Sequence, residues 1–229
     1  MINFYNQNIT AQWMLAVLML MVPLLFVLFL LNIFREYTIT ACFLALFVPS
    51  LVQFFVAPFA KLTGHHQYLS SMLLFYSVGN KKYALPNGTS FDYLMHMRNV
   101  KPGFNFNKRL LVFYIDGLLR LVDKIEANEI EEASVFQGSS YFFNERTAKR
   151  LGFNSENTNR FLKIHFCINF IDLTWMYSLS QGRLSFPNIT KIQTISISAT
   201  TLALNKEKIL KLRLSLTKSR SRKTIEVEK

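Results

Sequence analysis

Two long apolar runs near the start of the chain, separated by one charged pair, Arg35 and Glu36, place the strongest constraint on the fold. Residues 13–31 are nineteen consecutive positions without a charged, amide or hydroxyl side chain. A helix of that length reaches roughly 28 Å, close to the thickness of the hydrocarbon core of a bilayer. Residues 39–60 form a second uncharged run with few polar side chains. The sequence therefore predicts a two-helix transmembrane hairpin, with spans at about 13–34 and 39–60.

A cleaved signal peptide and a buried core helix are the alternatives for these runs. A signal peptide has a basic start and a small-residue cleavage site, whereas residues 1–12 contain no Lys or Arg and Leu31-Asn32-Ile33 is a poor site for cleavage. A chain of 229 residues is also too short to wrap two such helices inside a soluble domain. We expect both runs to remain as membrane anchors.

Prolines lie near the middle of both spans. Pro23 and Pro49 should kink their helices, because proline lacks an N–H and its ring clashes with the preceding turn. Pro58 is expected to mark the end of the second span.

Basic residues near the span ends predict the orientation. Residues 1–12 have none, and the residues after the second span bring Lys61, Lys81 and Lys82. By the positive-inside rule the C-terminal side is cytoplasmic. Since two spans return the chain to its first side, we expect a multi-pass protein of a cell inner membrane or plasma membrane, with both termini cytoplasmic.

The charge of the chain lies almost entirely beyond the hairpin. The net charge is +12, and 25 of the 26 Lys and Arg residues follow residue 60. A basic domain tethered to a membrane is attracted to anionic headgroups, at about 1 kcal/mol for each nearby cation. No nucleic-acid-binding motif accompanies the charge, so the expected partners are the lipid bilayer and possible protein partners, with no nucleic acid.

Residues 61–84 are expected to connect the hairpin to the domain along the membrane interface. The stretch 68–78 is uncharged, aromatic and too short to span, so we expect it either to lie along the interface or to pack under the domain. His65 and His66 point about 100° apart on a helix and have no nearby acidic or His partner, so we expect a solvated or headgroup-facing pair, with no metal and no cofactor.

Residues 85–217 are predicted to form one small cytoplasmic domain, either mixed α/β or mostly α. Residues 91–100 fit a strand or a short helix. The stretch 134–143 predicts a buried strand. A helix should begin after Asn107 as N-cap and bury one stripe of its surface, which consists of Leu111, Ile115, Leu118, Val122 and Ile125.

A short helix is expected at 144–151, with Asn144 as N-cap and Gly152 as a left-handed stop before Phe153. The order of helix, strand and short helix ending in Leu151-Gly152-Phe153 resembles the C-terminal half of the GNAT acyltransferases, over about residues 100–153. The resemblance implies an acyl-CoA-type donor whose pyrophosphate is bound by backbone N–H groups at a helix start.

The residues that would form this anion site lie between Val100 and Arg109. They are Lys101, Gly103, Asn107, Lys108 and Arg109. The stretch departs from the family pattern of Arg/Gln-x-x-Gly-x-Gly/Ala, since it has one Gly, a Pro and two Phe residues.

Residues 161–180 are predicted to form one buried helix rather than a third span, because three ionisable groups would be costly in a bilayer. His165 and Asp172 share a face of this helix and could meet only through Asn169, so we interpret them as a polar patch.

For residues 189–216 a helix is favoured, with strand-like alternation as the alternative. The basic segment 218–229 is expected to be disordered, and either to contact the cytoplasmic leaflet or to act only as a solubilising tail.

No residue is assigned a catalytic role, because none of these patterns has the spacing of a catalytic group. The sequence favours an integral membrane protein whose basic cytoplasmic domain docks a partner or anionic headgroups without catalysis. The alternative is a membrane-tethered GNAT-like transferase.

Overall fold

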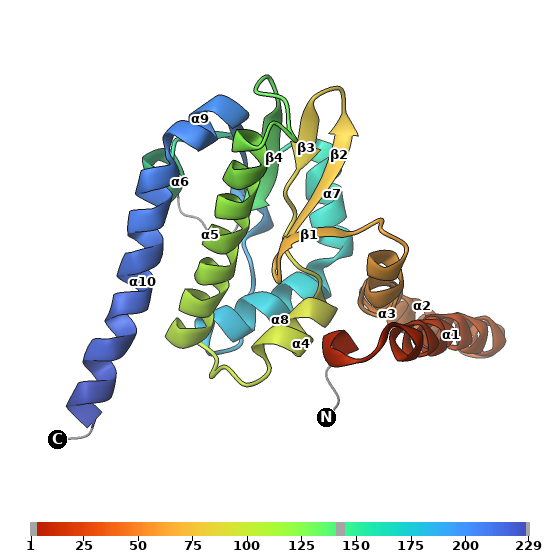
Figure 1. Cartoon of the computed structure of the whole chain (residues 1–229). Helices are drawn as coiled ribbons and strands as arrows, with labels where there is room; N and C mark the ends of the chain where they lie inside the picture. The colour runs from red at the N-terminus through yellow and green to blue at the C-terminus, as the bar shows by residue number, and fades with distance from the viewer. Residues whose placement is uncertain (1–3, 141–144, 228–229) are drawn as a thin grey trace.

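The structure is a computed structural model that describes residues 4–140 and 145–227. Three apolar helices come first and project from one corner of a mixed α/β domain (Figure 1). A short 3-10 helix precedes them. These elements are η1 (Phe4–Asn6), α1 (Ile9–Phe34), α2 (Thr38–Ala45) and α3 (Val48–Leu62). We refer to α1, α2 and α3 as the N-terminal helices.

The first predicted span is present as α1. Its 26 residues are long and apolar enough to cross a membrane, and most of its large side chains are exposed. Asn8 caps the helix by accepting a hydrogen bond from the Ala11 N–H at 2.8 Å. Pro23 lies inside α1 without interrupting it, so the helix is continuous through the position where a kink was expected.

The second predicted span is divided into α2 and α3, which are bent by 44° at a short break. Pro49 lies in the first turn of α3, where its missing N–H costs no hydrogen bond. A break at this proline agrees with the sequence. The expectation for Pro58 was wrong, because α3 continues through Pro58 to Leu62.

The domain consists of a sheet with helices packed on it. Its strands are β1 (Gln67–Ser70), β2 (Leu73–Gly79), β3 (Lys82–Ala84), β4 (Val135–Ser140), β5 (Asn154–Asn157) and β6 (Gln193–Ser198). Its helices are α4 (Ser90–Met97), α5 (Phe104–Glu126), α6 (Glu145–Arg150), α7 (Arg160–Ile168), α8 (Phe170–Gln181), η2 (Ile189–Lys191), α9 (Ala199–Leu204) and α10 (Lys206–Val227). Of the two predicted classes, mixed α/β is the one observed.

The strands lie in the order β1-β2-β3-β4-β6-β5. Neighbours are antiparallel except β3 and β4, which run parallel with Tyr83 opposite Phe136. Beyond this pair, the Leu85 N–H still donates to the Gln137 carbonyl at 2.7 Å. A Cβ at Gly138 would lie 3.1 Å from the Leu85 carbonyl oxygen, so glycine allows the two chains to approach closely.

Residues 61–84 were expected to connect the hairpin to the domain, with the stretch 68–78 either along the membrane interface or packed under the domain, and packing within the domain is what the structure has. Their larger part forms β1, β2 and β3, one half of the sheet. Leu69, Leu73 and Leu74 are each at most 3% exposed, and α5 packs against β1 and β2. A short apolar stretch can have the same composition in a core strand as at a membrane interface. Composition alone therefore does not distinguish the two, and here the packing of α5 against the stretch does.

The long helix predicted to follow Asn107 is α5, and the predicted apolar stripe is its core-facing side. Ile115, Leu118 and Val122 are at most 3% exposed. The start was misplaced by one turn, because the N-cap is Gly103 rather than Asn107. Gly103 has φ of 93°, a conformation that favours glycine.

The sequence allowed either a helix or a strand for the segments 91–100 and 189–216. Residues 90–97 form a helix, whereas the second segment contains a strand, β6, followed by α9 and the start of α10. The single helix expected at 161–180 was wrong, since Asn169 separates α7 from α8. β4 lies in the strand expected at 134–143, of which residues 141–143 are outside the described ranges.

The predicted short helix is present as α6, although Asn144 lies outside the described ranges. Gly152 has φ of 86° and ends the turn as predicted. Phe153 is 6% exposed and joins the core.

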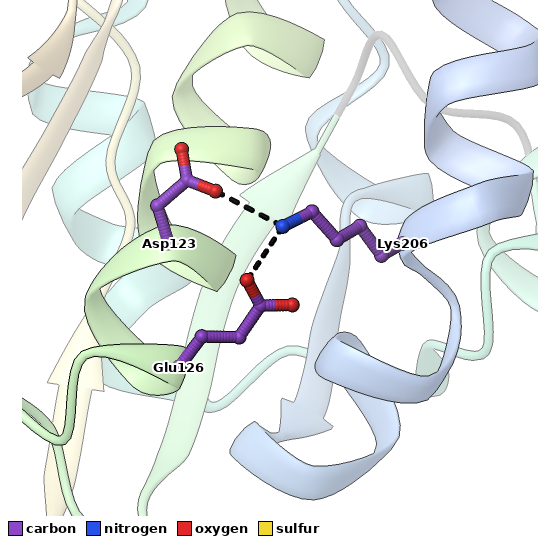
Figure 2. A network of polar contacts seen from close by, with 3 residues as sticks. All are labelled: Asp123, Glu126 and Lys206. Atoms are coloured by element: carbon purple, nitrogen blue, oxygen red, sulfur yellow. Dashed lines mark hydrogen bonds and ion pairs between the residues drawn. The ribbon is translucent and has the colours of Figure 1, made fainter.

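The last helix, α10, packs against α5 along the left of the view (Figure 1). Lys206 at its start donates to Asp123 at 3.2 Å and to Glu126 at 2.6 Å (Figure 2). Arg213 further along pairs with Asp116. The predicted end of regular structure near Thr217 was wrong, because the helix continues to Val227. Lys, Arg, Ser and Glu residues there are compatible with a helix that the preceding turns have already nucleated.

Candidate functional site

The most unusual polar group in the domain is Asp92 in the first turn of α4, which is 0% exposed. Thr89 and Asp92 form a capping box, in which each side chain binds the backbone N–H of the other residue. The Thr89 N–H and hydroxyl both donate to Asp92 Oδ2, at 2.8 and 2.9 Å. One carboxylate oxygen of Asp92 thus accepts two hydrogen bonds from the N-cap residue of the same helix.

Two tyrosines from distant parts of the chain complete the shell around this carboxylate. The Tyr5 hydroxyl, from η1, donates to Asp92 Oδ1. The Tyr68 hydroxyl, from β1, lies 3.1 Å from Oδ1 and 3.0 Å from Oδ2. Asp92 therefore links the segment before α1, the first strand and α4. We call Tyr5, Tyr68, Thr89 and Asp92 the Asp92 joint.

Burial, together with the charge of Asp92, keeps the tyrosines of the joint protonated. Burial, followed by the charge of Asp92, raises the pKa of both Tyr5 and Tyr68 far above the usual tyrosine value. Burial also lowers the pKa of His66 and His96, although Asp92 opposes this shift, so both imidazoles are neutral at pH 7. The tyrosines can therefore act as hydrogen-bond donors to a carboxylate but not as bases.

Lys61 and His96 pack on the ring of Tyr5. The Lys61 ammonium lies 3.5 Å from the centre of this ring and 5.0 Å from that of Tyr68, as in a cation–π contact. The His96 ring stacks on Tyr5 at 4.8 Å with an angle of 9° between planes. Lys61 belongs to the last turns of α3, so the C-terminal end of the N-terminal helices is part of the same cluster.

A small apolar core continues the joint into the N-terminal helices. The ring of Phe91 lies 5.5 Å from the rings of both Phe4 and Phe54. Ala16 of α1 and Ala57 of α3 are buried in the same cluster. The N-terminal helices and the domain are thus joined by both polar and apolar contacts.

The residues proposed for an anion site share one end of α5, and the backbone N–H of Gly103 among them is already bonded. The Gly103 N–H donates to the Leu179 carbonyl at 2.8 Å and is not available to a ligand. Lys101 and Asn107 are exposed, and Lys108 is half-buried. The Arg109 guanidinium lies 4.8 Å from the centre of the Phe113 ring. The two bulky residues of this stretch point in different directions, since Phe106 is 1% and Phe104 72% exposed.

Two hollows border this part of the domain. A groove of about 210 Å³ lies between the start of α5 and α10, and its lining includes Phe104, Asn107, Lys108, Tyr114 and Leu216. A second hollow of about 30 Å³ lies where β3 and β4 end, beside Leu85 and Gly138. The second has room for about one water molecule, far below the roughly 300 Å³ of a small ligand site.

The polar patch on α7 and α8 forms only in part. The Asn169 amide nitrogen lies 3.3 Å from His165 Nε2, but the Asp172 Oδ2 atom is buried without a hydrogen-bond partner among the described residues. Burial raises the pKa of Asp172 from 3.8 to about 6, and the Ser90 hydroxyl partly offsets the shift. His165 is exposed, so the two groups do not make an acid–base pair.

Neither a metal site nor a similar protein identifies the function of this chain. No group of three or more His, Cys, Asp or Glu side chains within residues 4–140 and 145–227 could hold a metal ion, and this includes His65 and His66. Comparison with protein-family models, with curated proteins and with solved structures finds no match for this chain.

The Asp92 joint was missed in the sequence, although half of it is visible there. Thr89-Ser90-Phe91-Asp92 has the spacing of a capping box, which predicts the start of α4. Tyr5 is separated from Asp92 by 87 positions and Tyr68 by 24. No local pattern connects tyrosines at these distances to a helix cap.

The joint predicts the effect of removing one tyrosine hydroxyl. Tyr5→Phe and Tyr68→Phe each remove a donor to a buried carboxylate and should lower the free energy of unfolding by about 1.5–3 kcal/mol. Tyr76→Phe is the matched control, because Tyr76 is 44% exposed, and should change it by less than about 0.5 kcal/mol. Urea unfolding of the full chain in mild detergent measures the difference. Equal stability of all three variants would show that the hydroxyls do not hold the joint.

Asp172 predicts a pH-dependent difference in stability. Its folded pKa of about 6 exceeds the ordinary 3.8, so between these values the folded chain holds a proton that the unfolded chain has lost. Wild-type stability therefore falls as pH rises through this window. Asp172→Asn should melt higher than wild type at pH 8, and the gap should close as pH falls below 6. Glu132→Gln, an exposed control, should show no such trend. A gap that is constant from pH 5 to pH 8 would contradict the burial of this carboxyl.

Proposed function

We propose that the chain is a membrane-anchored, non-catalytic protein whose basic cytoplasmic domain docks on anionic lipid headgroups. The observation that carries the proposal is the Asp92 joint, which fastens the domain to the helices that would lie in the bilayer. A domain held in this way cannot drift from the surface as it would on a flexible linker. Its nearest cations therefore stay within a Debye length of the headgroups.

In this proposal α1 is the first span and α2 with α3 is a second, broken span. The break before Pro49 is compatible with a span, because proline-interrupted helices are tolerated in membranes when neighbouring helices cover the freed groups, and α1 packs against both α2 and α3. Lys61 then lies at the cytoplasmic boundary, and both termini are cytoplasmic. The membrane would be a cell inner membrane or a plasma membrane.

A group of exposed cations lies where α5 begins and α8 ends. A Cβ on Gly182 would lie 3.0 Å from the Cα of Gly103, so these two segments touch. Exposed Lys101, Arg109 and Arg183 flank this contact, and we call them the basic face. α8, which ends there, packs on α4, and α4 packs on α3. The basic face is therefore connected to the N-terminal helices through two layers of helix packing.

Carboxylates are distributed away from the basic face. The sequence contains no Asp or Glu between Asp92 and Asp116. The acidic residues of α5 instead pair with α10, as Lys206 does with Asp123 and Glu126 (Figure 2). Cations on the α10 side are thus partly neutralised within the domain, whereas the basic face adds to the attraction toward an anionic surface.

A membrane-tethered transferase is the second candidate. It is favoured by the order α5, β4, α6 followed by Leu151-Gly152-Phe153, the features on which the resemblance to GNAT acyltransferases rests. Against it, the Gly103 N–H is already bonded and the hollow at the ends of β3 and β4 is small, which leaves the groove beside Asn107 and Lys108 as the space for an acyl-CoA-type donor. We therefore place docking ahead of transfer.

Hydrogen exchange in nanodiscs tests docking directly. With anionic lipid, backbone exchange of residues 98–103 should slow relative to neutral lipid, and about 0.5 M salt should abolish the effect because the Debye length falls to about 4 Å. Replacement of Lys101, Arg109 and Arg183 by Gln should abolish it too. The matched control replaces Lys82, Arg150 and Lys208, exposed cations elsewhere on the domain, and should leave it intact.

The same experiment can overturn the proposal. Exchange of residues 98–103 that is identical in anionic and neutral nanodiscs would exclude headgroup docking by this face. An equal loss of protection in both triple variants would show that net charge, rather than the basic face, is responsible.

A further inference from the structure

Helix α7 turns an apolar row outward. Phe161, Ile164 and Ile168 are 82%, 56% and 53% exposed, at spacings of three and four that place them on one side of the helix. The opposite side faces the core through Phe166, which is 9% exposed. A helix of a soluble surface would place polar residues where this row lies.

The loop after α8 extends the apolar row. Phe186 is 65% exposed, and its ring stacks on that of Phe170 at 6.2 Å with an angle of 8° between planes. Phe170 is the first residue of α8 and follows α7 closely in the chain. We call Phe161, Ile164, Ile168 and Phe186 the α7 patch. Exposed apolar side chains that gather in this way mark a contact site.

Charge around the α7 patch indicates what covers it. Exposed Arg160 and Lys191 and half-buried Lys163 belong to α7 or to η2, which contacts α7. Between these residues the only carboxylate is Asp172, which is buried. An apolar row flanked by cations, with no exposed acid between Arg160 and Lys191, is complementary to an anionic bilayer surface, where apolar side chains enter the acyl boundary and cations remain among headgroups.

The position of α7 agrees with this occupant. α7 packs on α8, which is connected through α4 to α3 and the Asp92 joint. In Figure 1, α7 and the N-terminal helices lie on the right of the domain and α10 on the left. A patch tethered in this way meets the bilayer as an intramolecular event, so that weak insertion is sufficient.

We infer that the α7 patch inserts into the interfacial layer of the same membrane that α1 crosses. The inference rests on the proposed function and adds to it an apolar contact with the lipid acyl region. The basic face would then be one of two contacts, and α7 would lie in the plane of the interface as an amphipathic helix does.

Quenching by lipid-attached nitroxides tests insertion in the full chain. In a background with Cys42→Ala and Cys167→Ala, a polarity-sensitive dye is attached at Ile164→Cys, in nanodiscs that contain anionic lipid with a nitroxide near the top of the acyl chain. The matched control carries the dye at Leu204→Cys on α9, since Leu204 is 84% exposed and apolar. We expect loss of most of the fluorescence at position 164 and little loss at position 204. Phe161→Ser with Ile168→Ser should restore the fluorescence at position 164.

Two outcomes would overturn the inference: no quenching at position 164, and equal quenching at both positions. If the unquenched dye at position 164 is also blue-shifted, a second copy or a protein partner covers the patch instead. Headgroup docking, the proposed function, is tested separately by the hydrogen exchange of residues 98–103. A protected segment 98–103 with an unquenched dye at position 164 would leave headgroup docking in place and remove insertion alone.

Discussion

Burial of the Asp92 carboxylate is the constraint on which the rest of the structure depends. An isolated carboxylate loses several kcal/mol when it leaves water, so it is found buried only where its oxygens accept enough hydrogen bonds. Thr89 supplies two donors from within α4, and Tyr5 and Tyr68 supply the others from η1 and β1. The pKa of both tyrosines is raised by burial, so these donors keep their protons at any physiological pH.

The joint determines which surfaces of the domain can meet a membrane. α4 carries the carboxylate and packs between α3 and α8, so the position of α8 follows from that of the N-terminal helices. The basic face lies at the end of α8, and α7 begins the same helical layer. The basic face and the α7 patch are therefore on elements connected to the N-terminal helices, while the acidic residues of α5 are paired with α10. This arrangement supports docking on lipid rather than catalysis in a cleft.

Sequence patterns predicted the elements whose determinants are local. The absence of charge over 13–31 predicted α1, and the stripe from Leu111 to Ile125 predicted α5 because one helix face carries the whole signal. Elements that depend on a distant partner were not predictable. The composition of β1 and β2 is also that of an interfacial segment, and the packing of α5 against them shows that they belong to the domain core.

The candidate site shows the same limit. The proposed anion-site residues are neighbours in sequence, but Leu179, from another helix, takes the Gly103 N–H. The outward row of α7 had the periodicity expected for a core helix, and periodicity alone does not say which side of a helix is buried. The sequence spacing predicts the capping box of Thr89 and Asp92, but it does not predict that Tyr5 and Tyr68 bind the same carboxylate.

The central claim is that the domain is fixed to the N-terminal helices rather than tethered loosely. The only two cysteines of the sequence are both exposed, and Cys42 lies on α2 of the N-terminal helices whereas Cys167 lies on α7 of the domain. Spin labels on these two residues allow pulsed EPR on the otherwise unmodified chain in nanodiscs. We predict one narrow distance distribution in the wild type, and a broad one when Asp92→Ala removes the acceptor of all these hydrogen bonds. A broad distribution in the wild type would contradict the account.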